Sequence, residues 1–268
     1  MIGLAIDTTS EACSVALRDS HGNIAQRCAH APRQHGELLL RWVEELLQAA
    51  DLKPAQLDAV WVTQGPGSFT SLRLGFSVAT ALAFALDRPV VPVSSLLALA
   101  ARCGDPDMAP AAATGSVAST TAMPTPMSGL VLATLDARLG EIYAAWYCCA
   151  ATGKPELTLQ GEEQLLKPAE LAWPEQTAAS VPVALGNGLL VDDARLLQRA
   201  QALGFHCQAD CWPQARDLFA LADIDSGQAA WEVQLPYLRK KVADKPSPQV
   251  PQAAPAQQSG SGHLTDGQ

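Results

Sequence analysis

The residue types best suited to chemistry lie in residues 64–73, which read QGPGSFTSLR. This stretch follows an apolar strand pattern and precedes an apolar helical pattern that runs to Leu86. Gly65 and Gly67 allow a sharp turn without a Cβ clash, and Ser68 is placed to cap the helix through its hydroxyl. Exposed N–H groups at such a helix start could hold an anion, or the turn could simply aim the helix at a partner protein. Both interpretations are open from the local sequence.

Two catalytic interpretations of this stretch fail on its sequence. A Walker A phosphate loop needs Lys-Ser or Lys-Thr after its last glycine, whereas Gly67 is followed by Ser68 and Phe69. A nucleophile elbow needs the pattern Gly-x-Ser-x-Gly, which residues 66–70 do not complete. We therefore do not expect Ser68 to act as a nucleophile.

Asp7 ends the first apolar strand pattern and has two possible roles. It could position Mg²⁺ as the phosphate-loop acid of a kinase, or it could cap the turn that follows the strand. Residues 8–10 are Thr-Thr-Ser and lack the glycine that lets a phosphate approach the backbone. The sequence therefore favours turn capping.

The sequence contains no pattern that is typical of a metal or cofactor site. No two of the 5 histidines stand at positions i and i+4, and none of the 7 cysteines forms a Cys-x-x-Cys pair. We expect no metal site, no cofactor and no catalytic residue. Residues 136–143 place two acids and an arginine around a hairpin turn, which is either a solvated turn or a partner contact through Arg138 and Glu141.

Composition indicates a folded protein with an acidic surface. The chain has 268 residues, 48% of them hydrophobic, which suffices for one large domain or two lobes. Its formal charge of −9 provides no broad cationic surface for nucleic acid, so we expect any RNA to be bound mainly by another protein. The first residues lack a basic region ahead of an apolar one, and no apolar stretch of membrane-spanning length is free of polar interruption. These features predict a cytoplasmic protein with reduced thiols.

The order of elements predicts an α/β fold. Three strand patterns, the first two at residues 2–6 and 13–17 and the third at 24–31, precede a helical pattern at 37–47. A strand at residue 60, a helix at 69–86, a strand at 89–93 and a helix from Ser94 follow, which favours a sheet that is partly parallel with an antiparallel hairpin at its edge. This order suits one lobe of an actin-like fold.

The second half repeats this pattern weakly. We expect an N-terminal lobe at 1–103, a flexible linker at 104–128, a C-terminal lobe at 129–243 and a disordered tail at 244–268. Within the second lobe, strands are predicted at 130–136, 142–148 and 182–188, and a helical stretch runs to Ala202. We interpret the basic run at 237–241 as the solvent-exposed end of a helix or strand.

Several motifs together resemble the TsaB (YeaZ) family. They are AIDTT at 5–9, HGELL at 35–39, GPGSFTSLR at 65–73, VSSL at 93–96, DARLGE at 136–141 and PYLR at 236–239. The glycine motif is the most specific of these, although the family usually has glycine where this chain has Ser71. The resemblance covers about residues 1–242 and implies an actin-like (ASKHA, ribonuclease-H-like) fold of two lobes, with mixed β-sheets flanked by helices.

The resemblance also implies a function in tRNA modification. Members of the family are non-catalytic partners of TsaD, the catalytic protein that forms threonylcarbamoyladenosine next to the anticodon. The helices at 35–47 and 68–86 would form the heterodimer face, and the same face would pair with itself when TsaD is absent. The ATPase TsaE would join a larger complex, and tRNA would be reached mainly through that complex. The implied partner-binding residues are His35, Leu38, Leu39, Trp42, Ser68, Leu72, Arg73, Leu74, Phe76 and Ala81.

An enzyme is the alternative hypothesis. An actin-fold phosphotransferase would bind ATP-Mg at Asp7 and at the Gly65–Ser68 loop, and a peptidase would need a metal or a nucleophile. The missing phosphate-loop glycine, lysine and histidine pair argue against both.

Overall fold

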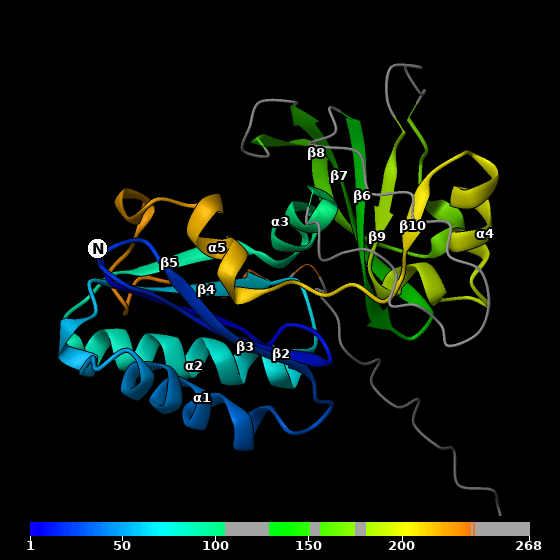
Figure 1. Ribbon diagram of the computed structural model, residues 1–268. Coiled ribbons are helices and arrows are strands. Elements are labelled where there is room, and N and C mark those ends of the chain that lie inside the picture. Colours follow the sequence, from blue (N-terminus) through cyan, green and yellow to red (C-terminus); the bar gives the residue numbers. More distant parts are fainter. Residues whose placement is uncertain (105–128, 151–155, 175–180, 237, 239–268) are drawn as a thin grey trace, which may run out of the picture. The chain divides into compact units, whose positions relative to one another are not determined.

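The computed structural model describes residues 1–104, 129–150, 156–174, 181–236 and residue 238 (Figure 1). The predicted linker beyond Gly104, the predicted tail and most of the basic run at 237–241 lie outside these residues. Residues Met1–Leu238 form one compact unit by their internal contacts. The lobe boundaries expected from the sequence therefore stay predictions.

The first sheet has five strands in the order β3-β2-β1-β4-β5. β1 pairs with β4 and β4 with β5 in parallel, whereas β1–β2 and β2–β3 are antiparallel. The expected element order and the antiparallel hairpin at one edge are both confirmed. The strands are β1 (Gly3–Asp7), β2 (Ala12–Arg18), β3 (Ile24–His30), β4 (Ala59–Gly65) and β5 (Val90–Ser94).

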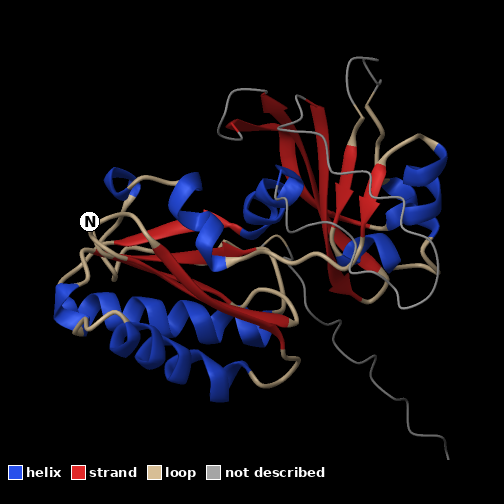
Figure 2. Cartoon of the chain, viewed as in Figure 1, coloured by secondary structure: helices blue, strands red, loops and turns tan. Residues whose placement is uncertain are grey.

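Helices cover both faces of this sheet (Figures 1 and 2). On one face lie α1 (His35–Ala49) and α2 (Phe69–Leu86), which pack side by side. On the other face lie α3 (Ser95–Ala100) and α5 (Ala215–Leu221). Successive residues of a strand point to opposite faces, so Leu4 and Ile6 contact the first helix pair while Ala5 faces the second.

The second sheet also has five strands, in the order β10-β9-β6-β7-β8. Its neighbours β6–β7 and β7–β8 are antiparallel, and β6–β9 and β9–β10 are parallel. One face packs on α3 and the other on α4. The elements are β6 (Gly129–Arg138), β7 (Glu141–Ala150), β8 (Glu156–Leu166), β9 (Val183–Leu185), β10 (His206–Gln208) and α4 (Arg195–Ala202).

The sequence predicted β6, β7, β9 and α4 but not β8, β10 or α5. β8 lies at the sheet edge and is largely exposed, so its residues carry little apolar alternation. β10 and α5 are short. Short 3-10 helices at Pro54–Gln56, Ala101–Gly104, Pro168–Glu170, Asn187–Leu190 and Ile224–Ser226 complete the described chain. All 7 cysteines are free thiols.

Candidate functional site

The glycine turn between β4 and α2 lies directly on the turn that follows β1. A Cβ added to Gly67 would lie 2.3 Å from the Thr9 carbonyl oxygen, so only glycine fits this approach. The Ser68 N–H donates to the same oxygen at 2.8 Å. Gly65, which precedes a cis peptide bond to Pro66, has a φ of 105°, a left-handed conformation that favours glycine.

A second contact fixes the first turns of α2. The Thr8 hydroxyl donates to the Ser71 carbonyl at 2.6 Å, and a Cβ on Gly75 would lie 2.3 Å from the Thr8 Oγ1. The turn after β1 therefore holds the start of α2 through both Thr8 and Thr9.

The predicted capping bond of Ser68 is wrong. Ser68 occupies the N-cap position, but its hydroxyl makes no capping hydrogen bond and is exposed. The backbone contact between Ser68 and Thr9 holds the helix start instead. Because this contact uses the Ser68 N–H and brings the Thr9 carbonyl oxygen to the turn, the geometry favours the tight-loop interpretation over an anion site.

Asp7 is enclosed where β1 ends. Its Oδ1 accepts hydrogen bonds from the hydroxyls of Thr9 at 2.6 Å and Thr63 at 2.7 Å, and from the Thr9 N–H at 3.4 Å. Burial raises the pKa of Asp7 to about 6, although these bonds act to lower it. The N–H bond is the turn-capping role that the sequence favoured. A side chain with no exposed surface offers no ligand position for Mg²⁺ in this conformation.

α2 is apolar on its outer face as well as on its inner face. Leu72, Gly75, Ala79 and Ala83 are buried against the sheet, yet only 28% of the helix residues are buried. Among the described helices, α2 alone is long and apolar enough to cross a membrane, a test that core helices of ordinary proteins also pass. An apolar helix this exposed is a candidate binding surface.

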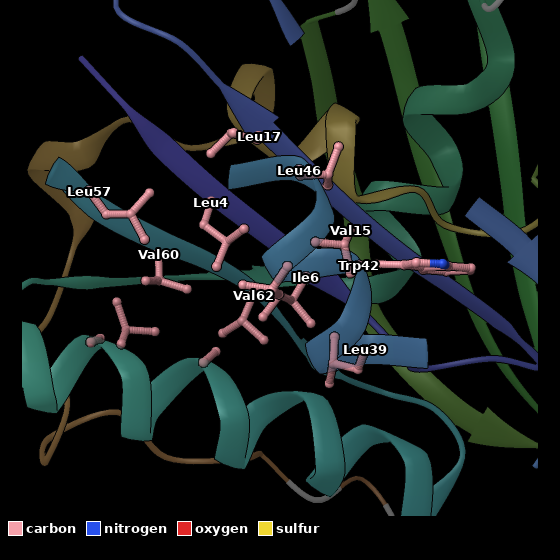
Figure 3. Packing of buried hydrophobic residues seen from close by; sticks show 14 of the residues in the cluster. Leu4, Ile6, Val15, Leu17, Leu39, Trp42, Leu46, Leu57, Val60 and Val62 are labelled. Carbon is pink, nitrogen blue, oxygen red and sulfur yellow. The ribbon is translucent and has the colours of Figure 1, made fainter. Parts of the chain in front are cut away.

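The structure divides the residues expected on the partner-binding face. His35, Leu39, Trp42 and Leu72 are buried, and Figure 3 shows Leu39 and Trp42 in the core cluster beneath the sheet. His35 is held inside because its Nε2 lies 3.1 Å from the carbonyl oxygens of Ser10 and Ala12. These four side chains are therefore largely covered in this conformation, so their expected role in partner binding stays a prediction. The remaining residues are exposed or half-buried, and they are Leu38, Ser68, Arg73, Leu74, Phe76 and Ala81.

Two aromatic side chains that the sequence analysis did not single out extend the exposed face of α2. Phe84 and Trp231 are 66% and 68% exposed, and their rings meet edge to face at 6.3 Å. They line a groove of about 200 Å³ at the C-terminal end of the helix. Phe84 continues the helical spacing and could have been identified from it, whereas Trp231 lies in a segment without periodicity.

A larger groove, of about 1000 Å³, lies at the N-terminal ends of α1 and α2. Arg138 at its edge bonds Asp136 in its own hairpin and Glu11 after β1, each at 2.9 Å. The Arg138 hydrogen bond is the main reason that the pKa of Glu11 lies below its usual value. The hairpin expected at 136–143 is confirmed, and Arg138 forms an ion pair within the chain.

No group of His, Cys, Asp or Glu among the described residues is arranged to hold a metal ion.

Comparisons with known proteins match the chain to TsaB and TsaD proteins. Residues 27–180 match the family model for TsaD, tRNA N6-adenosine threonylcarbamoyltransferase. The chain is 30% identical to the tRNA threonylcarbamoyladenosine biosynthesis protein TsaB of Escherichia coli K12 over an alignment of 262 residues, which covers 91% of this chain and 97% of the relative. It is 36% identical to the Haemophilus influenzae protein of the same name over 142 residues, about half of each chain.

Solved structures give the same result. The structure of YeaZ from Pseudomonas aeruginosa superposes with a TM-score of 0.70 at 30% identity, and the match covers 88% of this chain and 100% of that one. These likenesses and the two mixed sheets flanked by helices confirm the actin-like (ASKHA) fold.

Proposed function

The chain belongs to the TsaB (YeaZ) family, and on that premise we propose that it is a non-catalytic partner of TsaD that stabilises and orients the catalytic subunit. Its relatives are named as tRNA threonylcarbamoyladenosine biosynthesis proteins, and this chain takes part in that biosynthesis. We place it in the cytoplasm, with TsaE in a larger complex and tRNA reached mainly through the complex.

The exposed face of α2, which combines apolar and small side chains with a few polar ones, carries this proposal. Arg73, Ser77 and Ala81 are exposed in successive turns of the helix, and the half-buried Leu74 and Phe76 border them. Small side chains let a partner helix approach closely, while apolar area removed from water contributes about 25 cal/mol per Å². The face therefore suits packing against helices of another protein.

The turn beside Asp7 supports the non-catalytic part of the proposal. Thr9 and Ser68 are in direct backbone contact where a phosphotransferase would need room for phosphates. Asp7 is enclosed by two threonine hydroxyls. The alternative function, an ATP-Mg-dependent phosphotransferase, would require both contacts to open.

Charge on α2 supports the homodimer expected for the isolated chain. Arg73 lies near the start of the helix and Asp87 caps its end, about 21 Å apart at 1.5 Å per residue. Two antiparallel copies of α2 would place each arginine near the aspartate of the other copy, with Ala81 near the crossing point. Such a contact is self-complementary, as a twofold dimer requires.

Ala81→Glu tests the face directly, because it places a charge on an exposed helical position without filling the core. The variant should run as a monomer in light scattering and lose measurable binding to TsaD. Ala202→Glu makes the same exchange at an exposed position of α4 and should keep both properties.

Titration calorimetry with TsaD and with ATP-Mg distinguishes the two functions. If Ala81→Glu bound TsaD as the unaltered chain does, the proposed face would be wrong. Micromolar binding of ATP-Mg by the isolated chain would instead support the phosphotransferase.

A further inference from the structure

Asp7 is a buried carboxylate whose two oxygens have unequal surroundings. Oδ1 accepts the hydrogen bonds from Thr9 and Thr63, whereas Oδ2 has no partner among the described residues. A carboxylate that is ionised in this position leaves one buried, charged oxygen without a donor among the described residues, which is costly. A proton on the carboxyl group removes that cost.

Among the described residues, the titratable groups with a charge interaction to Asp7 supply no positive charge. Thr63 of β4 and Thr9 are neutral, and the nearby ionisable groups are the thiols of Cys13 in β2 and Cys28 in β3. Burial raises the pKa of both thiols, so they stay neutral near pH 7. Burial is therefore the main influence on the pKa of Asp7. With a pKa of about 6, the carboxyl group changes charge close to neutral pH.

Asp7 is connected to the start of α2 through two consecutive residues. Its Oδ1 holds Thr9, and the Thr9 carbonyl accepts the Ser68 N–H. The adjacent Thr8 hydroxyl bonds the Ser71 carbonyl. Opening of the turn around Asp7 would therefore disturb these contacts with α2 as well.

We propose that Asp7 is a proton-controlled support for the start of α2: its neutral form holds the turn after β1 against the glycine turn, and its ionisation loosens both. This device regulates the face assigned to TsaD above, so its consequence for assembly rests on the proposed function. By linkage, a partner that holds α2 in place favours the proton on Asp7, and mild acid favours the complex.

Hydrogen exchange of the Ser68 amide in the isolated chain tests the support itself, since this N–H donates to Thr9. Protection is compared at pH 5 and pH 7.5 after correction for the intrinsic exchange rate. We expect protection to fall with rising pH by several-fold, with a ceiling of about 10-fold, because a shift of the pKa from 3.8 to about 6 is only partly expressed between these two pH values. Asp7→Asn should remove this pH dependence.

Asp58→Asn is the matched control. Asp58 accepts the Ile2 N–H at the other end of β1, at 2.7 Å, and the exchange makes the same change of charge far from the glycine turn. In Asp58→Asn, the pH dependence of Ser68 amide protection should match that of the unaltered chain. Equal protection of the unaltered chain at both pH values, or the same pH dependence in Asp7→Asn, would overturn the proposal.

Thr63→Val separates a titrating support from a purely structural one. Loss of one hydroxyl donor to Oδ1 should raise the pKa of Asp7 further and move the midpoint of the exchange profile to higher pH. A profile that keeps its midpoint would count against the proposal. Because these measurements need no partner, failure to bind TsaD would refute the proposed function and leave this result unaffected.

Discussion

Replacing Gly67 with alanine tests whether the glycine turn is held by direct backbone contact. Gly67 does not have a left-handed φ, in contrast to Gly65, so its backbone conformation is open to alanine. The obstacle is space alone. The added Cβ would lie 2.3 Å from the Thr9 carbonyl oxygen and 2.8 Å from the Thr9 Cβ.

The loss of stability in Gly67→Ala follows from the two turns that must move apart. A methyl group cannot approach a carbonyl oxygen within 3.0 Å, so the glycine turn and the turn after β1 must separate. Overpacking of this kind costs about 1–3 kcal/mol. Separation also lengthens the Ser68–Thr9 hydrogen bond, which contributes about 1 kcal/mol. We expect Gly67→Ala to lower the free energy of unfolding by about 2–4 kcal/mol.

Urea unfolding followed by tryptophan fluorescence measures this difference. Gly36→Ala is the control, because its added Cβ has no neighbour closer than 4.0 Å and it lies in the first turn of α1. That variant should be as stable as the unaltered chain or slightly more so. A loss of less than about 1 kcal/mol in Gly67→Ala would refute the close contact as a stabilising feature.

Three further predictions concern single side chains. Between pH 4 and pH 7 the unaltered chain should lose about 2 kcal/mol of unfolding free energy relative to Asp7→Asn, because a folded pKa raised from 3.8 to about 6 gives stability that is present below the unfolded pKa and lost as the pH rises; parallel urea profiles would contradict this. Ser71→Ala should raise stability by about 1 kcal/mol, since the buried Ser71 hydroxyl has no hydrogen-bond partner among the described residues, and an unchanged urea midpoint would count against it. Arg138→Ala should cost at most about 1 kcal/mol at low salt and nothing at 1 M salt, as expected of a partly exposed ion pair with Glu11; a salt-independent loss in thermal unfolding would show a different role.

The first sheet and its helices could be predicted because their periodicities are strong. The larger apolar side chains of β1, Leu4 and Ile6, recur at every second residue, and the helical pattern ends at Leu86 as the structure has it. The edge strand β8 was missed because an exposed edge needs little apolar alternation. Its bulge at residues 161–163 also interrupts the period of two.

The residues of the candidate face were harder to assign. α2 is apolar on nearly all sides, so its sequence does not tell which side meets the sheet. Leu72 was expected on the surface and is buried, while Phe84 was overlooked and is exposed. Close approaches such as those of Gly67 and Gly75 to the turn after β1 depend on how β1 and α2 meet in space, which local sequence does not encode.

The most direct test of the non-catalytic role combines mass and activity. The purified chain, its organism's TsaD and the mixture are measured by light scattering, and each sample is assayed for threonylcarbamoyladenosine formation with TsaE and the remaining substrates present. We expect a heterodimer mass and activity only when both chains are present, with Asp7→Asn still supporting activity. A chain that stays apart from TsaD, or an Asp7→Asn variant that assembles fully and is inactive, would contradict the account.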